Sequence, residues 1–397
     1  MHVKEQDSVN NKIIRRNIIS MFPAGFAYAI VVGFVFMVDM LLAGFIIGKA
    51  AIAVVAIGLP CYGMFLALVN ATVHGTELRC TWILGAGDNK YYKHSFAGGF
   101  YFTVLLSLAF FFVIQIFAKQ LIIGFGGSKL PPEIFPQALL YLRICSPMIV
   151  FCAVYSVPLM ITGVLGYQVI KVSANVINIA CNLIFSVTLV ILLPQEWKLA
   201  GLGIGSSSAA MIEALFLLIA AKVKKMNMSF RPTMLSIREI ASTFRSGLPA
   251  SLDNVIDCIA AAVSNNILIT FFPEEPLIIS TVAVVNNIKK IARMAPTGIG
   301  YAASTLFGVL YSERDKSGLK RSVWEVLRFG SFVTLVWAAI VFAVLPLLMK
   351  VYGMPANHDV RLGSIFQLGF LLFFLVVFVL TIFYGTLWHV AFSCFYS

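Results

Sequence analysis

Charged residues are scarce in this sequence, and their scarcity excludes whole classes of protein. Of its 397 residues only 12% are charged, whereas 60% are hydrophobic and the mean hydropathy is +0.93. Soluble proteins average about 25% charged and about 45–50% apolar residues. The composition therefore excludes a cytosolic enzyme and a secreted domain, and most of the chain is expected to lie in a lipid bilayer.

The sequence also lacks the signs of a disulfide scaffold, a β-barrel and a cleavable leader. Its seven cysteines fall singly inside apolar segments, which indicates buried thiols. The apolar runs are continuous instead of alternating with period two, and this pattern excludes transmembrane β-strands. Arg15 and Arg16 precede a full-length first span with no cleavage-like stretch, so this span is predicted to be an anchored helix.

Ten apolar runs are long enough to cross a membrane. A hydrocarbon core of about 30 Å takes about 20 helical residues, and each run reaches that length. We therefore predict an all-α, polytopic membrane protein. The predicted spans are residues 23–48, 50–75, 96–120, 138–163, 170–193, 200–221, 247–271, 277–310, 325–350 and 363–390.

Basic residues are distributed unevenly between the two sides of these spans. Segments on the N-terminal side hold 18 of them, and the opposite loops hold 6. Loops rich in Lys and Arg stay in the cytoplasm, so the N-terminus is predicted to be cytoplasmic, with the protein in the plasma (inner) membrane. The net charge of +12 then reflects topology, and nucleic-acid binding is not expected.

A polar segment at residues 223–246 separates six predicted spans from four and is typical of a cytoplasmic linker. The halves on either side are related by an internal repeat. Pro23 and Pro249 open the first and seventh spans at an offset of 226 residues. Asp88 and Asp315 follow the second and eighth spans at an offset of 227. Both halves are predicted to start on the cytoplasmic side, and residues match at the same places in each half. Such a pattern is typical of the parallel repeats in transporters.

These boundaries predict a two-lobe helical bundle. Counted from the repeat starts, the second half is about 50 residues shorter than the first, so it holds four of an expected six spans. Residues 1–22 are predicted to form a cytoplasmic N-terminal segment. Residues 23–222 form an N-lobe of six transmembrane helices, and residues 247–397 form an incomplete C-lobe of four.

Ionisable residues inside the spans are few, and each would cost about 2.5–3.5 kcal/mol at the centre of a lipid-facing helix. Asp39 lies 16 residues into the first span with no base within one helical turn, so we expect it to bind a proton or an ion. The alternative is a carboxylate that only packs against Asn or Ser neighbours. Glu77 is expected to pair with Arg79. The other acids in the spans are Glu213, Asp253 and Asp257.

Two asparagines in the fifth span are candidate partners of Asp39. Asn178 and Asn182 lie four residues apart and hence on one helical face. Their carbonyl oxygens could join the Asp39 carboxylate in a small oxygen site for Na⁺. Asparagines also join membrane helices by hydrogen bonds alone, and the sequence leaves both interpretations open.

A second charged group is predicted on the seventh and eighth spans. Asp253 and Asp257 lie one turn apart, and the short turn that follows places Asp257 level with Lys290 and Arg293. In the structural interpretation these four charges cancel in an intramembrane network. In the functional interpretation they line a proton-sensitive or substrate-facing cavity.

Several short motifs, taken in order, resemble the helices of multidrug and toxic compound extrusion (MATE) transporters. The resemblance covers about residues 20–390 and rests on the order of the motifs along the chain. The matching positions are Val38, Asp39, Gly44 and Gly48, then Ala53, Val54, Pro60 and Gly75, then residues 84–88, 141–144 with Pro147, 178–182, 247–249 and 308–315.

The resemblance implies twelve helices in two six-helix lobes that alternate between inward-open and outward-open states. It also implies export of cationic or amphipathic compounds in exchange for Na⁺ or H⁺. On this resemblance Asp39 matches the essential carboxylate of the first helix, and Asn178 matches an asparagine that binds the cation with it. Asn182 stands where many members have Asp, and Asp257 matches an acid on the seventh helix of some members. We expect a monomer with small-molecule and lipid partners and no cofactor beyond the coupling ion.

Three other functions are alternatives to a multidrug antiporter. A lipid-linked oligosaccharide flippase of related fold would use a cationic cavity for diphosphate headgroups, which Lys289, Lys290 and Arg293 could supply. A truncated, non-transporting remnant would explain the short second half. A membrane-embedded enzyme is not expected, because the acids do not cluster as a Mg²⁺ site requires. The sequence also has no His and Glu pair at metal spacing, serine elbow or phosphate-binding loop.

Overall fold

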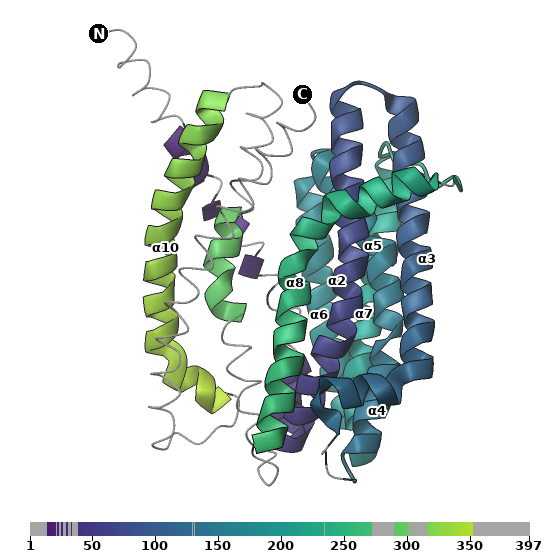
Figure 1. Ribbon diagram of the computed structural model, residues 1–397, viewed down its shortest axis with the longest axis vertical. Coiled ribbons are helices and arrows are strands. Elements are labelled where there is room, and N and C mark those ends of the chain that lie inside the picture. The colour runs from purple at the N-terminus through teal and green to yellow at the C-terminus, as the bar shows by residue number, and fades with distance from the viewer. Residues whose placement is uncertain are drawn as a thin grey trace. The chain divides into compact units, whose positions relative to one another are not determined.

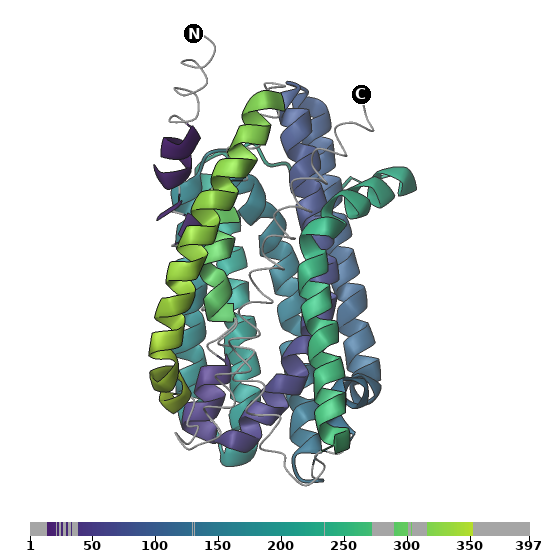
Figure 2. The ribbon, with the colours of Figure 1, turned by 60° about the vertical axis from the view of Figure 1, so that its left-hand side comes forward.

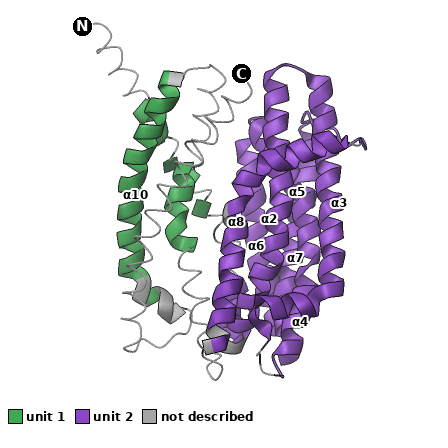
Figure 3. Ribbon diagram, in the orientation of Figure 1, with its two compact units in different colours: residues 1–34, 284–397 green, residues 35–283 purple. Residues whose placement is uncertain are grey.

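The structure is a computed structural model, and its described residues are helical wherever they have regular structure. They fall into two compact units, residues 35–283 and residues 1–34 with 284–397, which Figure 3 shows in different colours. The two predicted lobes, residues 23–222 and 247–397, have different boundaries from these units. The division into lobes stays a prediction. The described residues are 14–20, 22–23, 25–26, 29–30, 33, 39–128, 130, 132–233, 235–271, 290–300, 303 and 316–351.

A bundle of long helices makes up the unit of residues 35–283 (Figure 1). It begins with the π-helix η1 (Ala43–Ile47), after which Gly48 turns the chain at φ 124°, a conformation that residues with a Cβ rarely adopt. The helices that follow are α2 (Lys49–Gly85), α3 (Asn89–Ile122), η2 (Ile123–Gly127), α4 (Phe135–Cys145), α5 (Pro147–Val164), α6 (Gln168–Leu192), η3 (Gln195–Trp197), α7 (Lys198–Val223) and α8 (Ile237–Phe271).

The unit of residues 1–34 and 284–397 is described over fewer residues. Its long helix is α10 (Lys316–Val351), and residues 290–300 are helical as well. Apolar side chains from the N-terminal residues and from both helical segments pack together in one core cluster. Its buried members are Ile14, Ile18, Ile299, Ala303 and Val326.

Six helical segments among the described residues are long and apolar enough to cross a membrane, and they confirm six of the ten predicted spans. These are the predicted second to sixth spans and the ninth, so the protein is an integral, multi-pass membrane protein. The first and eighth spans are described only in part, and the tenth, residues 363–390, lies outside the described residues. The six segments are Ala51–Gly85, Asn89–Gly127, Phe135–Val164, Gln168–Leu192, Gln195–Val223 and Ser317–Val344.

Two predicted spans differ in detail from the helices observed. The fourth is broken between α4 and α5, where Pro147 suits the first turn of a new helix because it has no N–H to donate. The seventh begins at Ile237, earlier than the predicted start at residue 247, so α8 includes the end of the predicted linker. Helix α8 contains Pro249 and bends in its N-terminal part, as Figure 1 and Figure 2 show.

Helices α2 and α8 cross with their backbones in contact. A Cβ placed on Gly247 would lie 1.9 Å from the carbonyl oxygen of Ala71, and one on Gly75 would lie 1.8 Å from the carbonyl oxygen of Thr243. Each helix thus presents two small residues, four positions apart, to the other. This is the arrangement by which membrane helices approach most closely, and it packs the predicted seventh span against the second.

Helices α6 and α7 approach each other in the same way. A Cβ on Gly205 would lie 2.9 Å from the Cα of Ser186, and one on Gly201 would lie 3.1 Å from the Cβ of Leu189. Small residues recur every fourth position along this face of α7, with Ala209 after the two glycines. The close approach lets short polar side chains of the two helices meet.

Elsewhere in the bundle, apolar side chains are either buried in a core cluster or exposed on the outer faces of the helices. A core cluster joins α2, α3 and α5. On the outer faces of α3 and α6, large side chains such as Leu105, Phe112 and Ile191 are exposed, as expected of helices that face lipid. The buried members of the cluster are Val73, Cys80, Tyr92, Phe96, Phe100, Val157 and Ile161.

Candidate functional site

Asp39 lies just before η1 and is buried, with only 5% of its surface exposed. Both of its carboxylate oxygens lie within hydrogen-bond distance of the Ser206 hydroxyl on α7, at 2.8 and 2.9 Å, and that hydroxyl donates to them. A neutral hydroxyl is therefore the donor to this buried acid. From the sequence, Ser206 could either add a hydroxyl to the cation site or belong to a Gly and Ser run that marks a close helix contact.

Asn182 reaches Asp39 through Ser206. Its Nδ2 donates to the Ser206 Oγ at 3.1 Å, and its Oδ1 accepts from the Ser186 Oγ at 3.2 Å. The four residues are buried and form a hydrogen-bonded relay in which every donor points toward Asp39. The structure thus brings together two of the three predicted cation-coupling residues, and their role in coupling stays a prediction.

Asn178, the third predicted residue, contacts a different acid. Its Nδ2 donates to the Oε2 of Glu213 on α7 at 2.7 Å, and both residues are almost fully buried. The other oxygens of this pair, Asn178 Oδ1 and Glu213 Oε1, have no hydrogen-bond partner among the described residues. Glu213 follows Ser206 by seven residues, which is two helical turns, and this spacing could have placed it on the same face.

One face of each helix supplies these side chains. On α6, Asn175, Asn178, Asn182 and Ser186 are buried, while Leu183 and Ile184 on its other face are exposed. This amphipathic pattern turns the asparagines toward α7, where the glycines described above let the two helices come close. The buried residues that line the α6–α7 contact and Asp39 form what we call the polar seam: Asp39, Asn178, Asn182, Ser186, Ser206 and Glu213.

Aromatic and thiol groups surround the Asp39 end of the polar seam. Tyr62 on α2 and Tyr141 and Cys145 on α4 are buried and lie within electrostatic reach of the Asp39 carboxylate. The ring of Tyr141 packs directly over Gly58, where a Cβ would come within 2.8 Å of it. A lipid-facing acid would lack such a shell, so Asp39 faces the interior of the bundle, as the sequence analysis expected of intramembrane charges.

The second predicted group of charges is divided between the two compact units. Asp253 and Asp257 lie one turn apart on α8, in the unit of residues 35–283. Lys290 and Arg293 belong to the other unit. The predicted network among these four residues, and the cavity it would line, therefore stay predictions.

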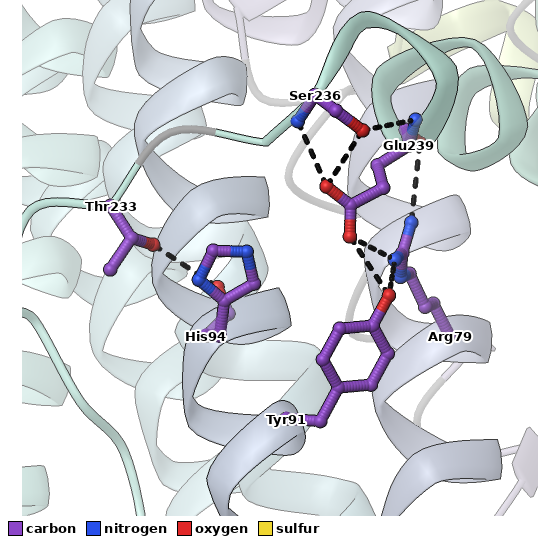
Figure 4. A network of polar contacts seen from close by, with 6 residues as sticks. All are labelled: Arg79, Tyr91, His94, Thr233, Ser236 and Glu239. Carbon is purple, nitrogen blue, oxygen red and sulfur yellow. Dashed lines mark hydrogen bonds and ion pairs between the residues drawn. The ribbon is translucent and has the colours of Figure 1, made fainter.

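The linker between α7 and α8 is tied to the ends of α2 and α3 by polar contacts (Figure 4). Glu239 on α8 accepts from Arg79 Nη2 at 2.6 Å and from the Tyr91 hydroxyl at 2.8 Å, and Arg79 also hydrogen-bonds to that hydroxyl. Arg79 was expected to pair with Glu77, and this prediction is wrong. Its ion-pair partner is Glu239, which is 160 residues away along the chain. We call Arg79, Tyr91 and Glu239 the linker clasp.

A capping box begins α8 at the linker clasp. The Ser236 backbone N–H and hydroxyl donate to Glu239 Oε2 at 2.8 and 2.9 Å, and the Glu239 N–H donates back to the Ser236 Oγ at 3.3 Å. Partial burial acts to raise the pKa of Glu239, but these hydrogen bonds, the Tyr91 hydroxyl and Arg79 together lower it to about 2. Glu239 therefore stays ionised at every physiological pH.

The rest of the linker packs along α3. The Phe230 ring makes edge contacts with Phe96 and Phe100, and its carbonyl oxygen accepts from the Tyr101 hydroxyl at 2.7 Å. Further along, the Thr233 hydroxyl donates to the carbonyl oxygen of His94 at 3.2 Å (Figure 4). The predicted linker is thus a packed part of the unit of residues 35–283.

Comparison with known proteins agrees with this architecture. The MatE family model matches residues 23–192, which include α2 to α6. Among curated proteins none matches the chain in sequence. Solved structures of similar fold include an outward-facing multidrug resistance MATE family transporter, at TM-score 0.75 and 18% identity over 94% of this chain and 81% of that one.

Two other solved structures represent different states of such transporters. An inward-facing MATE family transporter matches at TM-score 0.70 and 17% identity, over 89% of this chain and 79% of that one. The transporter DinF-BH, solved in complex with a dye, matches at TM-score 0.71 and 18% identity, over 88% and 77%. The chain thus matches the MatE family model over residues 23–192 and shares the fold of solved MATE family transporters.

Proposed function

We propose that this protein is a secondary-active antiporter that exports cationic or amphipathic compounds in exchange for H⁺ or Na⁺ bound at Asp39. The observation that carries the proposal is the placement of Asp39, a buried carboxylate whose two oxygens accept from the Ser206 hydroxyl. An ionised acid is costly to bury in a membrane protein, and binding a cation removes most of that cost. The site is therefore suited to taking up and releasing a cation.

The partners of Asp39 suit both of its charge states. A hydroxyl can donate to a carboxylate, and it can equally accept from a protonated acid. An amide such as that of Asn182 can do the same by turning over, because it carries a donor at one end and an acceptor at the other. A paired arginine would instead hold Asp39 ionised. The relay of Ser206, Asn182 and Ser186 thus permits protonation without leaving a buried group unsatisfied.

Protonation would reverse the direction of the relay. In the structure every donor points toward Asp39, from Ser186 through Asn182 and Ser206. Once Asp39 carries a proton it can donate to Ser206, and the donors along α6 and α7 then point away from it. A cation can drive transport only through different affinities for the inward-open and outward-open states, and this reversal is the local change that could provide them.

The comparisons support this proposal through the states and ligands of the similar structures. Transporters of this fold have been solved in inward-facing and outward-facing conformations, and DinF-BH has been solved with a bound dye. The substrate class of this chain, its coupling ion, its monomeric state and a cytoplasmic N-terminus belong to the proposal.

Efflux of a fluorescent cationic dye from cells expressing the protein tests the proposal. Asp39→Asn keeps the size of the side chain and its hydrogen bond but cannot bind a cation as a carboxylate does. We expect it to abolish gradient-dependent efflux, while the matched control Glu133→Gln, at an exposed acid outside the polar seam, leaves efflux intact. Imposed Na⁺ and pH gradients identify the ion. Equal dye retention in wild type and Asp39→Asn under every gradient would overturn the proposal.

A further inference from the structure

The buried pair of Glu213 and Asn178 has two oxygen atoms that could still accept hydrogen bonds. Glu213 is 1% exposed and Asn178 is 2% exposed, so neither is solvated by bulk water. One hydrogen bond joins them, from Asn178 Nδ2 to Glu213 Oε2 at 2.7 Å. Glu213 Oε1 and Asn178 Oδ1 have no hydrogen-bond partner among the described residues. Burying two acceptors without donors costs free energy, and an additional donor between them would remove that cost.

A proton supplies that donor. A Glu213 protonated on Oε1 can donate to the amide oxygen of Asn178 while Asn178 Nδ2 still donates to Oε2, so that one added proton gives both unpaired oxygens a hydrogen bond. A hard metal cation fits less well. Such ions take about six or more oxygen ligands, whereas this pair offers two free ones.

The groups that face Glu213 do not hold it in one charge state. From α5 the thiol of Cys152 lies within its electrostatic reach, and from α6 the facing group is the neutral amide of Asn178. Lys171, also on α6, has its Nζ against the Met160 sulfur at 3.7 Å. Other titratable groups on the described elements packed against α7 are Tyr155 on α5, Cys181 on α6, Tyr141, Cys145 and the exposed Arg143 on α4, and the exposed Glu196 on η3.

Glu213 belongs to the same polar seam as Asp39. It lies two helical turns from Ser206 on α7, and its partner Asn178 lies one turn from Asn182 on α6. Between the two carboxylates the polar seam consists of hydroxyls and amides, which can reverse their hydrogen bonds as a proton arrives or leaves. Buried acids on neighbouring turns of one polar helix face are typical of proton pathways in membrane proteins.

We propose that Glu213 is a second proton-binding carboxylate of this transporter, held by Asn178, so that the polar seam carries two exchangeable protons. The proposal rests on antiport at Asp39 with H⁺ as the coupling ion, and it extends that function. A transport cycle that protonates both acids exchanges its substrate against two protons, and one that protonates Asp39 alone exchanges it against one. The number of protons coupled to substrate binding therefore separates the two cases.

That number is measured from the pH dependence of dye binding to the purified full-length protein in lipid vesicles. By linkage, the slope of log affinity against pH equals the number of protons exchanged, and we expect about two in wild type. We expect about one in Glu213→Gln, about one in Asp39→Asn and about zero in the double variant. Gln at position 213 keeps the oxygen that accepts from Asn178, so a purely structural Glu213 would leave the wild-type slope unchanged. That result would overturn the proposal.

Infrared difference spectra after a pH step give a second readout that does not depend on transport. We expect a carboxylic-acid signal that disappears in Glu213→Gln and shifts in frequency in Glu213→Asp, which retains the acid. If Glu213→Gln fails to fold, the comparison of wild type with Glu213→Asp decides, and identical spectra would refute proton binding at Glu213.

The two readouts also separate failure of the inference from failure of the proposed function. If Asp39→Asn changes neither efflux nor slope while the Glu213 signal still titrates, antiport at Asp39 is wrong and Glu213 remains a proton site. If Asp39→Asn lowers the slope and no Glu213 signal titrates, the second site alone is wrong.

Discussion

Replacing Gly247 with alanine is expected to push α2 and α8 apart and to destabilise the protein. The added methyl group would lie 1.9 Å from the Ala71 carbonyl oxygen and 2.4 Å from the Gly75 amide nitrogen. Both are backbone atoms of a helix, so neither can turn away as the end of a side chain could. Overpacking costs about 1–3 kcal/mol, and two backbone clashes put this case at the upper end. Better helix propensity returns about 1 kcal/mol, which leaves a net loss of about 2 kcal/mol.

Unfolding of the purified protein in detergent measures this loss. The matched control is Gly85→Ala, because a Cβ at Gly85 meets nothing within 4 Å, and we expect a change below about 0.5 kcal/mol there. Gly75→Ala should destabilise as much as Gly247→Ala, since its Cβ would lie 1.8 Å from the Thr243 carbonyl oxygen. The double variant should cost less than the sum, because helices already separated have room for the second methyl. If the destabilisation of the double variant equals the sum of the two single variants, or if Gly247→Ala is as stable as wild type, the close backbone crossing of α2 and α8 is contradicted.

Three further predictions concern the polar seam and the linker clasp. Ser206→Ala removes the donor to Asp39 and should lower gradient-driven dye efflux about tenfold, because a hydrogen bond to a charged group contributes about 1.5–3 kcal/mol. The control is Ser207→Ala, one residue further along α7, which should retain wild-type efflux. Gly205→Ala places a Cβ 2.9 Å from the Ser186 Cα and should lower both efflux and the melting temperature by separating α6 from α7. At the linker clasp, Glu239 has a pKa lowered to about 2 against about 4.3 in an unfolded chain, so its stabilising contribution is present above about pH 4.3 and is lost as the pH falls toward 2. The melting temperature should therefore drop over that range in wild type, and a Glu239→Gln variant with the same drop would contradict the assignment.

The membrane-spanning helices could be predicted from sequence because the bilayer fixes their length. Each span must be about 20 apolar residues long, and apolar runs of that length are visible without any knowledge of packing. The break between α4 and α5 interrupts the single span predicted at residues 138–163, although Pro147 favours the start of a new helix. The early start of α8 was missed although Ser236 and Glu239 have capping-box spacing, because the segment was interpreted by its charge alone.

The partners of the candidate site residues could be predicted only in part. Helical spacing put Asn178 and Asn182 on one face of α6, and the structure confirms that both point toward α7. Which acid each would meet depends on how α7 is rotated and on the close approach at Gly205, and neither can be read from one helix alone. For the same reason Glu213 was recognised as an intramembrane acid but was given no partner.

The linker clasp joins residues that are far apart in the sequence. Arg79 has an acid two residues away in Glu77, and short sequence separation favoured that pair. Residues two apart on a helix point to different sides, however, so the neighbouring acid could not face the guanidinium. The actual partner, Glu239, comes from a helix that crosses α2 at Gly75 and Gly247, and only the three-dimensional packing brings it there.

Proton movement in response to substrate is the direct readout of antiport at Asp39. The protein is reconstituted in lipid vesicles loaded with a fluorescent pH indicator, and a cationic dye is added on one side in lightly buffered solution. We expect a proton flux opposite to the dye flux in wild type and in Glu133→Gln, and none in Asp39→Asn. An opposing Na⁺ flux with the same dependence on Asp39 would instead identify Na⁺ as the coupling ion. Dye movement that is equal in wild type and Asp39→Asn, with no accompanying ion flux, would contradict antiport at Asp39.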